Sequence, residues 1–388
     1  MKLRLLAVHF AFALTGVVTT MLGPILPLLS ARWSLSDRQA GHLFTAQFLS
    51  SASSSVVGSK LISLIGPGWT MIIGMFVMAA GVALLSSSQW IVGVGAVCCY
   101  GVGLGFALPS TNLFVAQLIP EGRAAALNLL NFFWGVGAVS APLMIGLLLK
   151  PIGLTGLLLL LAFASAAAGI ASALTAHPSA TPRSKILTTS HTGETTFLLF
   201  LTTLLLFIYV GIETALSGWI PTFSLRTHHT SDSQTAILQA SFWSAILAGR
   251  LTAPLILRRI TGGRLIDYGI TTMLVGIAVF MLPGPAASLF LGVVVAGLGL
   301  SALFPTAVAI FTEWYGTGGA GSIVLGVAGL GGAALPWLVG YLSDKFHSLR
   351  VGFLSTMFAC VAMIVVHKMS GMRISHMRSS TNRILSSH

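Results

Sequence analysis

Long apolar runs, separated by short polar breaks, follow one another along almost the whole chain. Runs of about 18 or more apolar residues are typical of transmembrane helices, and by that criterion we count about twelve. They cover residues 3–30, 38–64, 69–87, 90–119, 123–149, 152–176, 197–221, 234–257, 265–283, 286–311, 318–343 and 349–369. The pattern therefore predicts an all-α membrane protein. The first run is too long for the core of a signal peptide, so we expect it to remain as the first helix.

The longest polar break separates the sixth run from the seventh. It reads AHPSATPRSKILTTSHTGETT over residues 176–196 and consists of residues typical of linkers. We therefore expect an N-terminal six-helix half over 1–176, a linker over 177–196, a C-terminal six-helix half over 197–370 and a tail over 371–388.

The two halves repeat each other. The fourth and tenth runs share a glycine–glycine–proline pattern at an offset of 196 positions, and the fifth and eleventh share another at 194. The first and seventh runs match at an offset of 195. The matched residues are Gly101, Gly103, Pro109 with Gly297, Gly299, Pro305; Gly135, Gly137, Pro142 with Gly329, Gly331, Pro336; and Gly16, Gly23 with Gly211, Gly218. One such match would mean little, because glycine is common in packed membrane helices. Three in the same order indicate a duplicated six-helix unit.

The basic residues predict the orientation. With the N-terminus inside, 13 Lys and Arg face the cytoplasm and 6 face the outside, while Arg250 falls within a run. Cytoplasmic loops of membrane proteins carry the excess of Lys and Arg. We therefore expect both termini in the cytoplasm. The short loops and compact halves favour a bacterial inner membrane.

Composition excludes several classes of protein. The chain is 55 % hydrophobic and 7 % charged, with a mean hydropathy of +0.94, far from the values of soluble domains. Its net charge of +12 does not indicate nucleic-acid binding, because the basic residues lie between membrane segments rather than in one patch. Cys98, Cys99 and Cys360 lie inside apolar runs and show neither disulfide nor metal-ligand spacing. Nothing in the sequence indicates an enzyme, a cofactor or a metal.

One carboxylate, Glu213, lies inside an apolar run. A charge at mid-membrane depth costs roughly 2.5–3.5 kcal/mol, so it usually faces a cavity or a partner and marks a pathway. The other seven acidic residues lie in or beside the breaks. Glu213 is therefore our leading candidate for substrate binding and for coupling to an ion.

Three further side chains are expected near the depth of Glu213. Counted from the cytoplasmic end of each run, Glu213 lies about 24 Å in, Trp243 about 21 Å, Gln47 about 25 Å and Gln239 about 27 Å. Hydroxyl groups need fixed donors and acceptors, and the C–H face of a sugar ring stacks on an aromatic surface. This set suits a sugar. Trp243 could instead serve only to pack helices together, and Gln47 could form a hydrogen bond between helices.

Arg250 shares a helix stripe with Gln239 and Trp243 but lies nearer the cytoplasmic end. Its depth of about 10 Å leaves it about 14 Å from Glu213 along the axis, too far for a direct salt bridge. We assign it, with Arg123 at the start of the fifth run, to gating.

Five segments carry a likeness to a known family. They read YVGIETALSGWIPTF (209–223), FWSAILAGRL (242–251), GLGLSALFPT (297–306), GVAGLGGAALPWLVGYLSD (326–344) and GLGFALPSTNLFVAQLIPEGRAAALNLLNFFWGVGAVSAPL (103–143). These segments resemble the fucose–galactose–glucose permease branch of the major facilitator superfamily, in which duplicated six-helix halves hold the substrate between them. The resemblance implies alternating-access transport of a monosaccharide, often coupled to a proton or a sodium ion.

The resemblance also implies site residues. Asn131 falls where fucose permeases carry a glutamine, and Trp134 where they carry an asparagine, so both are expected in the cavity. Asn112 in the fourth run is a comparable candidate. Proton-coupled fucose permeases carry acids in their first and fourth helices, whereas this chain has none there. Any coupling is therefore expected to rest on Glu213.

We expect a monomeric secondary transporter in the lipid bilayer that moves a monosaccharide of the glucose, galactose or fucose type, coupled to a proton or sodium ion. Three alternatives stay open: a multidrug or metabolite exporter, an uncoupled sugar uniporter, and a membrane receptor or scaffold that transports nothing.

Overall fold

The computed structural model describes residues 2–175, 193–315, 324 and 326–386, and all its regular elements in these ranges are α-helices. In chain order they are α1 (Lys2–Thr20), α2 (Leu22–Trp33), α3 (Asp37–Leu84), α4 (Trp90–Leu118), α5 (Arg123–Thr175), α6 (Gly193–His228), α7 (Asp232–Ile256), α8 (Gly262–Met281), α9 (Ala286–Ser301), α10 (Leu303–Tyr315), α12 (Gly331–Phe346) and α13 (Leu349–Ser386). Most of the predicted linker, residues 177–196, lies outside the described residues. So does the end of the predicted tail, residues 387–388.

Nine stretches of helix within the described ranges are long and apolar enough to cross a membrane. Two of them, α3 and α5, have 48 and 53 residues. As straight rods they would measure about 70–80 Å, more than twice the hydrocarbon thickness of about 30 Å. Each contains one glycine in the left-handed region, Gly66 (φ 83°) or Gly153 (φ 67°), a conformation that side-chain-bearing residues avoid.

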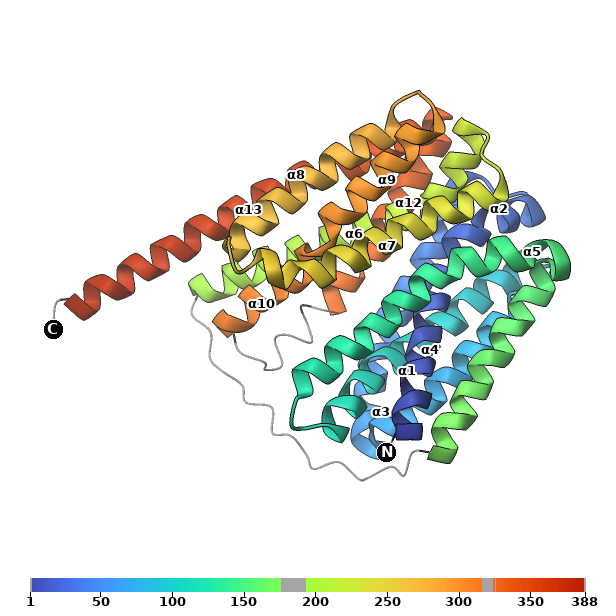
Figure 1. Ribbon diagram of the computed structural model, residues 1–388, viewed down its shortest axis with the longest axis horizontal. Helices are drawn as coiled ribbons and strands as arrows, with labels where there is room; N and C mark the ends of the chain where they lie inside the picture. Colours follow the sequence, from blue (N-terminus) through green and yellow to red (C-terminus); the bar gives the residue numbers. More distant parts are fainter. Residues whose placement is uncertain (1, 176–192, 316–323, 325, 387–388) are drawn as a thin grey trace.

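The chain turns back at both glycines. For α5 the reversal is visible beside the α5 label, where the two arms of the helix join (Figure 1). For α3 it follows from the packing, because Gly58 and Gly74, on opposite sides of Gly66, face the same level of α4 at Phe106 and Ala107. Each of these two helices therefore supplies two arms to the bundle.

The repeat in the sequence is matched by repeated contacts. Gly137 of α5 packs closely on the Ala13 carbonyl oxygen of α1, and Gly331 of α12 packs in the same way on the Phe207 carbonyl oxygen of α6. Both members of the first pair are offset from the second by 194 positions. Glycine permits these approaches because a side chain would collide with the neighbouring backbone.

The starts of α3 and α7 repeat as well. Ser36 accepts a hydrogen bond from the Gln39 backbone, and the Gln39 side chain accepts one from the Ser36 backbone. Ser231 and Gln234 form the same capping box, with the same Ser backbone angles of φ −70° and ψ 162°. A capping box satisfies two backbone donors that a helix start leaves free.

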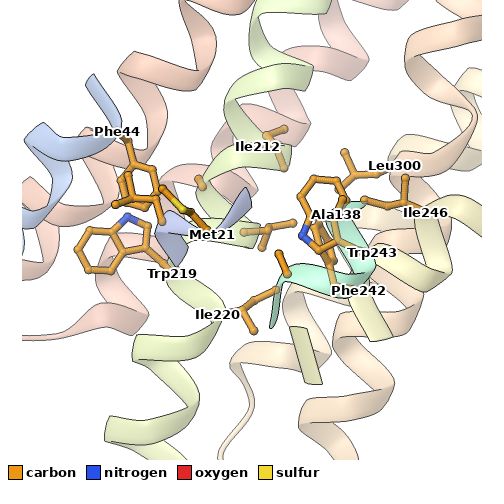
Figure 2. Packing of buried hydrophobic residues seen from close by; sticks show 14 of the residues in the cluster. Met21, Phe44, Ala138, Ile212, Trp219, Ile220, Phe242, Trp243, Ile246 and Leu300 are labelled. Carbon is orange, nitrogen blue, oxygen red and sulfur yellow. The ribbon is translucent and has the colours of Figure 1, made fainter. Parts of the chain in front are cut away.

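The helices form two bundles, α1–α5 and α6–α13, that meet at one end and diverge at the other (Figure 1). We call these the closed end and the terminal end, because both chain termini lie where the bundles diverge. The halves meet where α3 packs on α12, α5 on α7 and α2 on α6. Apolar side chains fill these contacts: Phe44 lies beside Trp219, and Trp243 lies beside Ala138 (Figure 2).

Candidate functional site

A cavity of about 2090 Å³ lies between the two halves. Its inner end is formed by Gly23, Phe44, Ser217 and Gly218, near the middle of the bundle. Residues at the terminal ends of the helices line its mouth, among them Leu127, Leu257 and Met372. Among the described residues, none from the loops at the closed end lines it. The cavity therefore opens at the terminal end and is sealed at the other.

Glu213 lies in the cavity wall as one corner of a triangle of polar groups. The Tyr209 hydroxyl donates to Oε1 of Glu213 at 2.9 Å, and Nη2 of Arg250 lies 3.3 Å from the same oxygen. Nη2 of Arg250 is also 3.5 Å from the Tyr209 hydroxyl. The Glu213 side chain is only 15 % exposed and that of Arg250 28 % exposed, so this is a largely buried charge pair. All three residues line the cavity.

Both of these contacts fall on one carboxylate oxygen of Glu213. Its second oxygen, Oε2, makes no hydrogen bond with the described residues and is not enclosed by them. An ionised carboxylate accepts about four hydrogen bonds, so Oε2 retains accepting capacity toward the cavity. The arrangement fixes one oxygen and leaves the other for a ligand.

The prediction that Arg250 lies too far from Glu213 for a salt bridge is wrong. The depths were counted from separate helix ends, whereas α6 has 36 residues and α7 has 25, so α6 overhangs α7 at the terminal end. Counted from the turn that joins the two helices, Glu213 lies about 22 Å and Arg250 about 27 Å along the axis. The long arginine side chain spans the remaining difference.

Trp134 of the N-terminal half and Trp243 of the C-terminal half meet edge to face. Their ring centroids are 5.7 Å apart at an interplanar angle of 80°, and both line the cavity. Trp243 is almost fully buried, and its Nε1 has no hydrogen-bond acceptor among the described residues. The two indoles form an aromatic wall beside the inner end of the cavity.

Asn112 and Asn131 line the cavity from the N-terminal half, as the resemblance implies. Each donates Nδ2 to the carbonyl oxygen one turn earlier in its helix, Leu108 at 2.9 Å and Leu127 at 2.8 Å. Their amide oxygens are therefore the groups left to accept from a ligand.

Gln47 and Gln239 lie behind the cavity wall rather than in it. Gln47 donates to the Thr19 carbonyl oxygen at 2.9 Å and accepts from the Tyr100 hydroxyl at 2.9 Å. Gln239 donates to the Ser217 carbonyl oxygen at 2.7 Å. Both side chains are buried, and both connect helices. Neither glutamine lines the cavity in this conformation, and the contacts of Gln47 agree with the alternative interpretation of a hydrogen bond between helices.

Arg123, the other residue assigned to gating, is exposed at the start of α5 and does not line the cavity. Sequence reasoning missed a cluster of α8 and α13, in which Nζ of Lys368 lies 2.9 Å and Nε2 of His367 lies 3.7 Å from the Asp267 carboxylate. It also missed Tyr209, although the spacing of four residues from Glu213 places both on one helix face. The contact between α8 and α13 has no local signal in the sequence.

The family follows from comparison with known proteins. Residues 8–290 match the family described as the Major Facilitator Superfamily. The chain belongs to the Major Facilitator Superfamily. It is a multi-pass membrane transporter of that fold, and the predicted all-α fold is confirmed, with nine candidate membrane helices among the described residues rather than the twelve predicted runs.

Individual relatives of the superfamily are distant. The glucose/mannose transporter GlcP of Bacillus subtilis is 24 % identical over 164 residues, which cover 41 % of this chain and 40 % of that protein. A POT family transporter solved with a thioalcohol-conjugated peptide has a TM-score of 0.80 and 13 % identity over 95 % of this chain and 96 % of that one. The transporter FucP in its outward conformation has a TM-score of 0.64 and 16 % identity over 94 % and 98 % of the two chains. The segment that matches GlcP covers 40 % of that protein. The two solved structures are too distant in sequence to show more than the shared fold.

Among the described residues that line the cavity, the formally charged side chains form two pairs of opposite sign. Glu213 is paired with Arg250, and Asp267 is paired with Lys368, within the same wall. All four belong to the C-terminal half, whereas the wall from the N-terminal half offers amides, hydroxyls and rings such as Asn131, Thr19 and Trp134. The site therefore combines one polar, charged wall with one neutral wall.

Proposed function

We propose that this transporter moves a monosaccharide across the membrane by alternating access. Its twelve crossings, six in each half, come from α3 and α5 crossing twice and from α1–α2 and α9–α10 each crossing as a broken helix. Both termini then lie in the cytoplasm of a bacterial cell, and the cavity is open inward. The protein works as a monomer in the inner membrane.

One observation carries the proposal: the free Oε2 of Glu213 lies in a cavity whose described charged residues are paired with each other. A carboxylate oxygen with open accepting capacity suits a substrate hydroxyl, which donates one proton to it. A charged substrate would need an unpaired charge of opposite sign, and Glu213 and Arg250 are already paired with each other. The proposed substrate is therefore neutral and hydroxyl-rich.

The aromatic wall supports the same class of substrate. Trp134, which packs edge to face against the almost fully buried Trp243, presents ring surface to the cavity, and a sugar offers C–H faces to stack on such a ring. The amide oxygens of Asn112 and Asn131 add hydrogen-bond acceptors from the N-terminal half, across the cavity from Glu213. The relative GlcP is named as a glucose/mannose transporter, which agrees with this class.

We assign the proposed coupling to a proton or a sodium ion to Glu213. Asp267 also lines the cavity, but it lies at the mouth and holds Lys368. Glu213 lies deeper, so a cation bound there would be carried with the substrate when the halves rock about the site. An uncoupled uniporter is the outcome if gradients have no effect.

A second candidate, the exporter of larger amphiphilic molecules, is favoured by one observation. The cavity of about 2090 Å³ is large and carries many phenylalanines. They are Phe12, Phe44, Phe48, Phe132, Phe304 and Phe311. An exporter of this kind would tolerate loss of single polar groups such as Glu213, because apolar contacts would supply most of the binding.

The test is uptake of radiolabelled glucose, galactose, mannose and fucose into proteoliposomes, with imposed proton or sodium gradients. We expect wild type to accumulate one of these sugars, and Glu213→Gln to abolish accumulation under a gradient. If the variant retains counterflow exchange, Glu213 is the coupling residue. Glu121→Gln is the matched control, because Glu121 is exposed in a loop. Absence of flux for every sugar would reject the sugar assignment, and retained accumulation by Glu213→Gln would reject its role.

A further inference from the structure

The closed end carries a second polar cluster, remote from the cavity. Nη1 of Arg226 lies 2.7 Å from Oδ1 and 2.9 Å from Oδ2 of Asp37, and the Ser343 hydroxyl donates to Oδ2 at 2.6 Å. The Ser36 hydroxyl donates to Asp344 at 3.4 Å. Asp37 and Ser36 belong to the N-terminal half, whereas Arg226, Ser343 and Asp344 belong to the C-terminal half. We call this cluster the Asp37 clamp.

The clamp joins the two halves, which distinguishes it from the ion pairs of the cavity. Glu213–Arg250 and Asp267–Lys368 each lie within the C-terminal half and can persist while the halves move apart. The Asp37–Arg226 pair cannot. If the halves separate at the closed end, the Asp37 carboxylate loses Arg226 and Ser343 together.

Asp37 is well placed to hold such contacts. It is the first residue of α3, directly after the capping serine, and the positive end of the helix dipole favours a carboxylate there. Arg226 lies in the last turn of α6, where a cation is favoured. The Asp37 side chain is only 11 % exposed, so water competes weakly for it, although Arg226 is 48 % exposed. Charge-assisted hydrogen bonds are the stronger kind.

The duplicated unit supplies a natural comparison. Asp232 occupies the position equivalent to Asp37, at an offset of 195, and starts α7 behind the same capping box. Its side chain is exposed, and it takes part in no salt bridge among the described residues. At the position equivalent to Arg226 stands Ala31. The Asp37 clamp thus exists at only one of two equivalent helix starts among the described residues. The capping box that both starts share therefore does not account for it.

We propose that the Asp37 clamp is the gate lock of the closed end: it stabilises the state open at the terminal end and must break each time the transporter opens on the other side. Asp37, Arg226 and Ser343 are positioning residues that never touch the substrate. The clamp sets how the two orientations are populated, and hence how readily the closed end opens to admit or release a ligand.

The test measures the opening of the closed end directly and needs no substrate. Nitroxide labels at Ser88, in the loop before α4, and at Ala287, in the first turn of α9, occupy exposed positions of the two halves at the closed end. They report the separation of the halves by pulsed electron paramagnetic resonance in lipid nanodiscs. The full chain is used, with Cys98, Cys99 and Cys360 replaced by alanine. We expect Asp37→Asn and Arg226→Gln to raise the ratio of the long-distance to the short-distance population about tenfold, the value of about one charge-assisted hydrogen bond. Ser343→Ala should raise it about threefold, in line with a weaker hydroxyl contact.

Asp232→Asn is the matched control, because it makes the same change at the equivalent helix start without an inter-half contact. Arg226→Lys keeps the charge but not the arginine geometry and should give an intermediate ratio. Melting temperature and gel filtration establish that each variant is folded; if Asp37→Asn is not, the two Arg226 variants decide. Ratios for Arg226→Gln equal to those for Asp232→Asn would overturn the clamp. Because no sugar is involved, that result would leave the proposed substrate untouched.

Discussion

A methyl group added at Gly23 should disfavour the conformation seen here. Gly23 of α2 lies at the inner end of the cavity, where the halves touch. Its new Cβ would press on the Ser217 carbonyl oxygen of α6 and lie 2.8 Å from Nε2 of Gln239 and 3.2 Å from Cα of Gly218. Ordinary van der Waals contact for such an atom begins at 3.4 Å. Two of the three neighbours are backbone atoms, which cannot rotate aside.

The cost follows from that geometry. The helices α2 and α6 must move apart by at least several tenths of an ångström, and overpacking of this kind costs about 1–3 kcal/mol. The strain exists only while the closed end is shut. Gly23→Ala should therefore raise the population open at that end by about 5- to 150-fold relative to wild type.

The same Ser88 and Ala287 labels measure this shift, again without substrate. Gly95→Ala is the control, because a Cβ at Gly95 of α4 would meet no atom within 4 Å. A Gly23→Ala distance distribution that matches Gly95→Ala would refute the reasoning, since the α2–α6 contact would then not depend on the orientation of the halves.

Two further predictions concern the triangle in the cavity wall. Arg250→Met should destabilise the protein by about 3–5 kcal/mol, because it leaves the Glu213 carboxylate buried without its positive partner. The melting temperature should fall, and adding Glu213→Gln to the same chain should restore most of the lost melting temperature. A double variant no more stable than Arg250→Met would show that the lost stability comes from packing. Tyr209→Phe removes one donor to Oε1 of Glu213 and should weaken substrate binding about fivefold, the equivalent of about 1 kcal/mol, measured by equilibrium binding of the transported sugar. Tyr268→Phe on the exposed face of α8 should change nothing, and equal affinities for the two variants would exclude Tyr209 from positioning Glu213.

The helices and their repeat were predictable because both depend on local pattern. Apolar runs of membrane length mark helices whatever they pack against, and the glycine spacings reflect helix contacts that the duplicated halves make twice. Gly137 and Gly331 show this directly, since they press on equivalent carbonyl oxygens at Ala13 and Phe207. The reversals at Gly66 and Gly153 lie close to the predicted breaks between apolar runs, because a break in the apolar pattern is also a local feature of the sequence.

The side-chain chemistry was predictable only where one residue type has few options. A lone carboxylate in an apolar run, Glu213, has to face a cavity or a partner, and it faces both. The Arg250 distance failed because it depends on the relative lengths of two helices. The neutral amides of Gln47 and Gln239 fit a cavity or a helix contact equally well, and only tertiary packing decides between these places. Asp267 and Lys368 meet across 101 positions, beyond the reach of any local pattern.

The duplication places equivalent backbones on both sides of the cavity, but the chemistry is not duplicated. At the positions that match Tyr209, Glu213 and Arg250, an offset of 195 gives Leu14, Val18 and Ser55. The charged pair therefore belongs to one half alone, and so does the basic member of the Asp37 clamp. A symmetric pair of walls would bind a substrate in two equivalent poses. Because the carboxylates among the described lining residues belong to one wall, whereas both walls carry aromatic rings, we expect a hydroxyl-rich substrate to bind in a single pose against the C-terminal half.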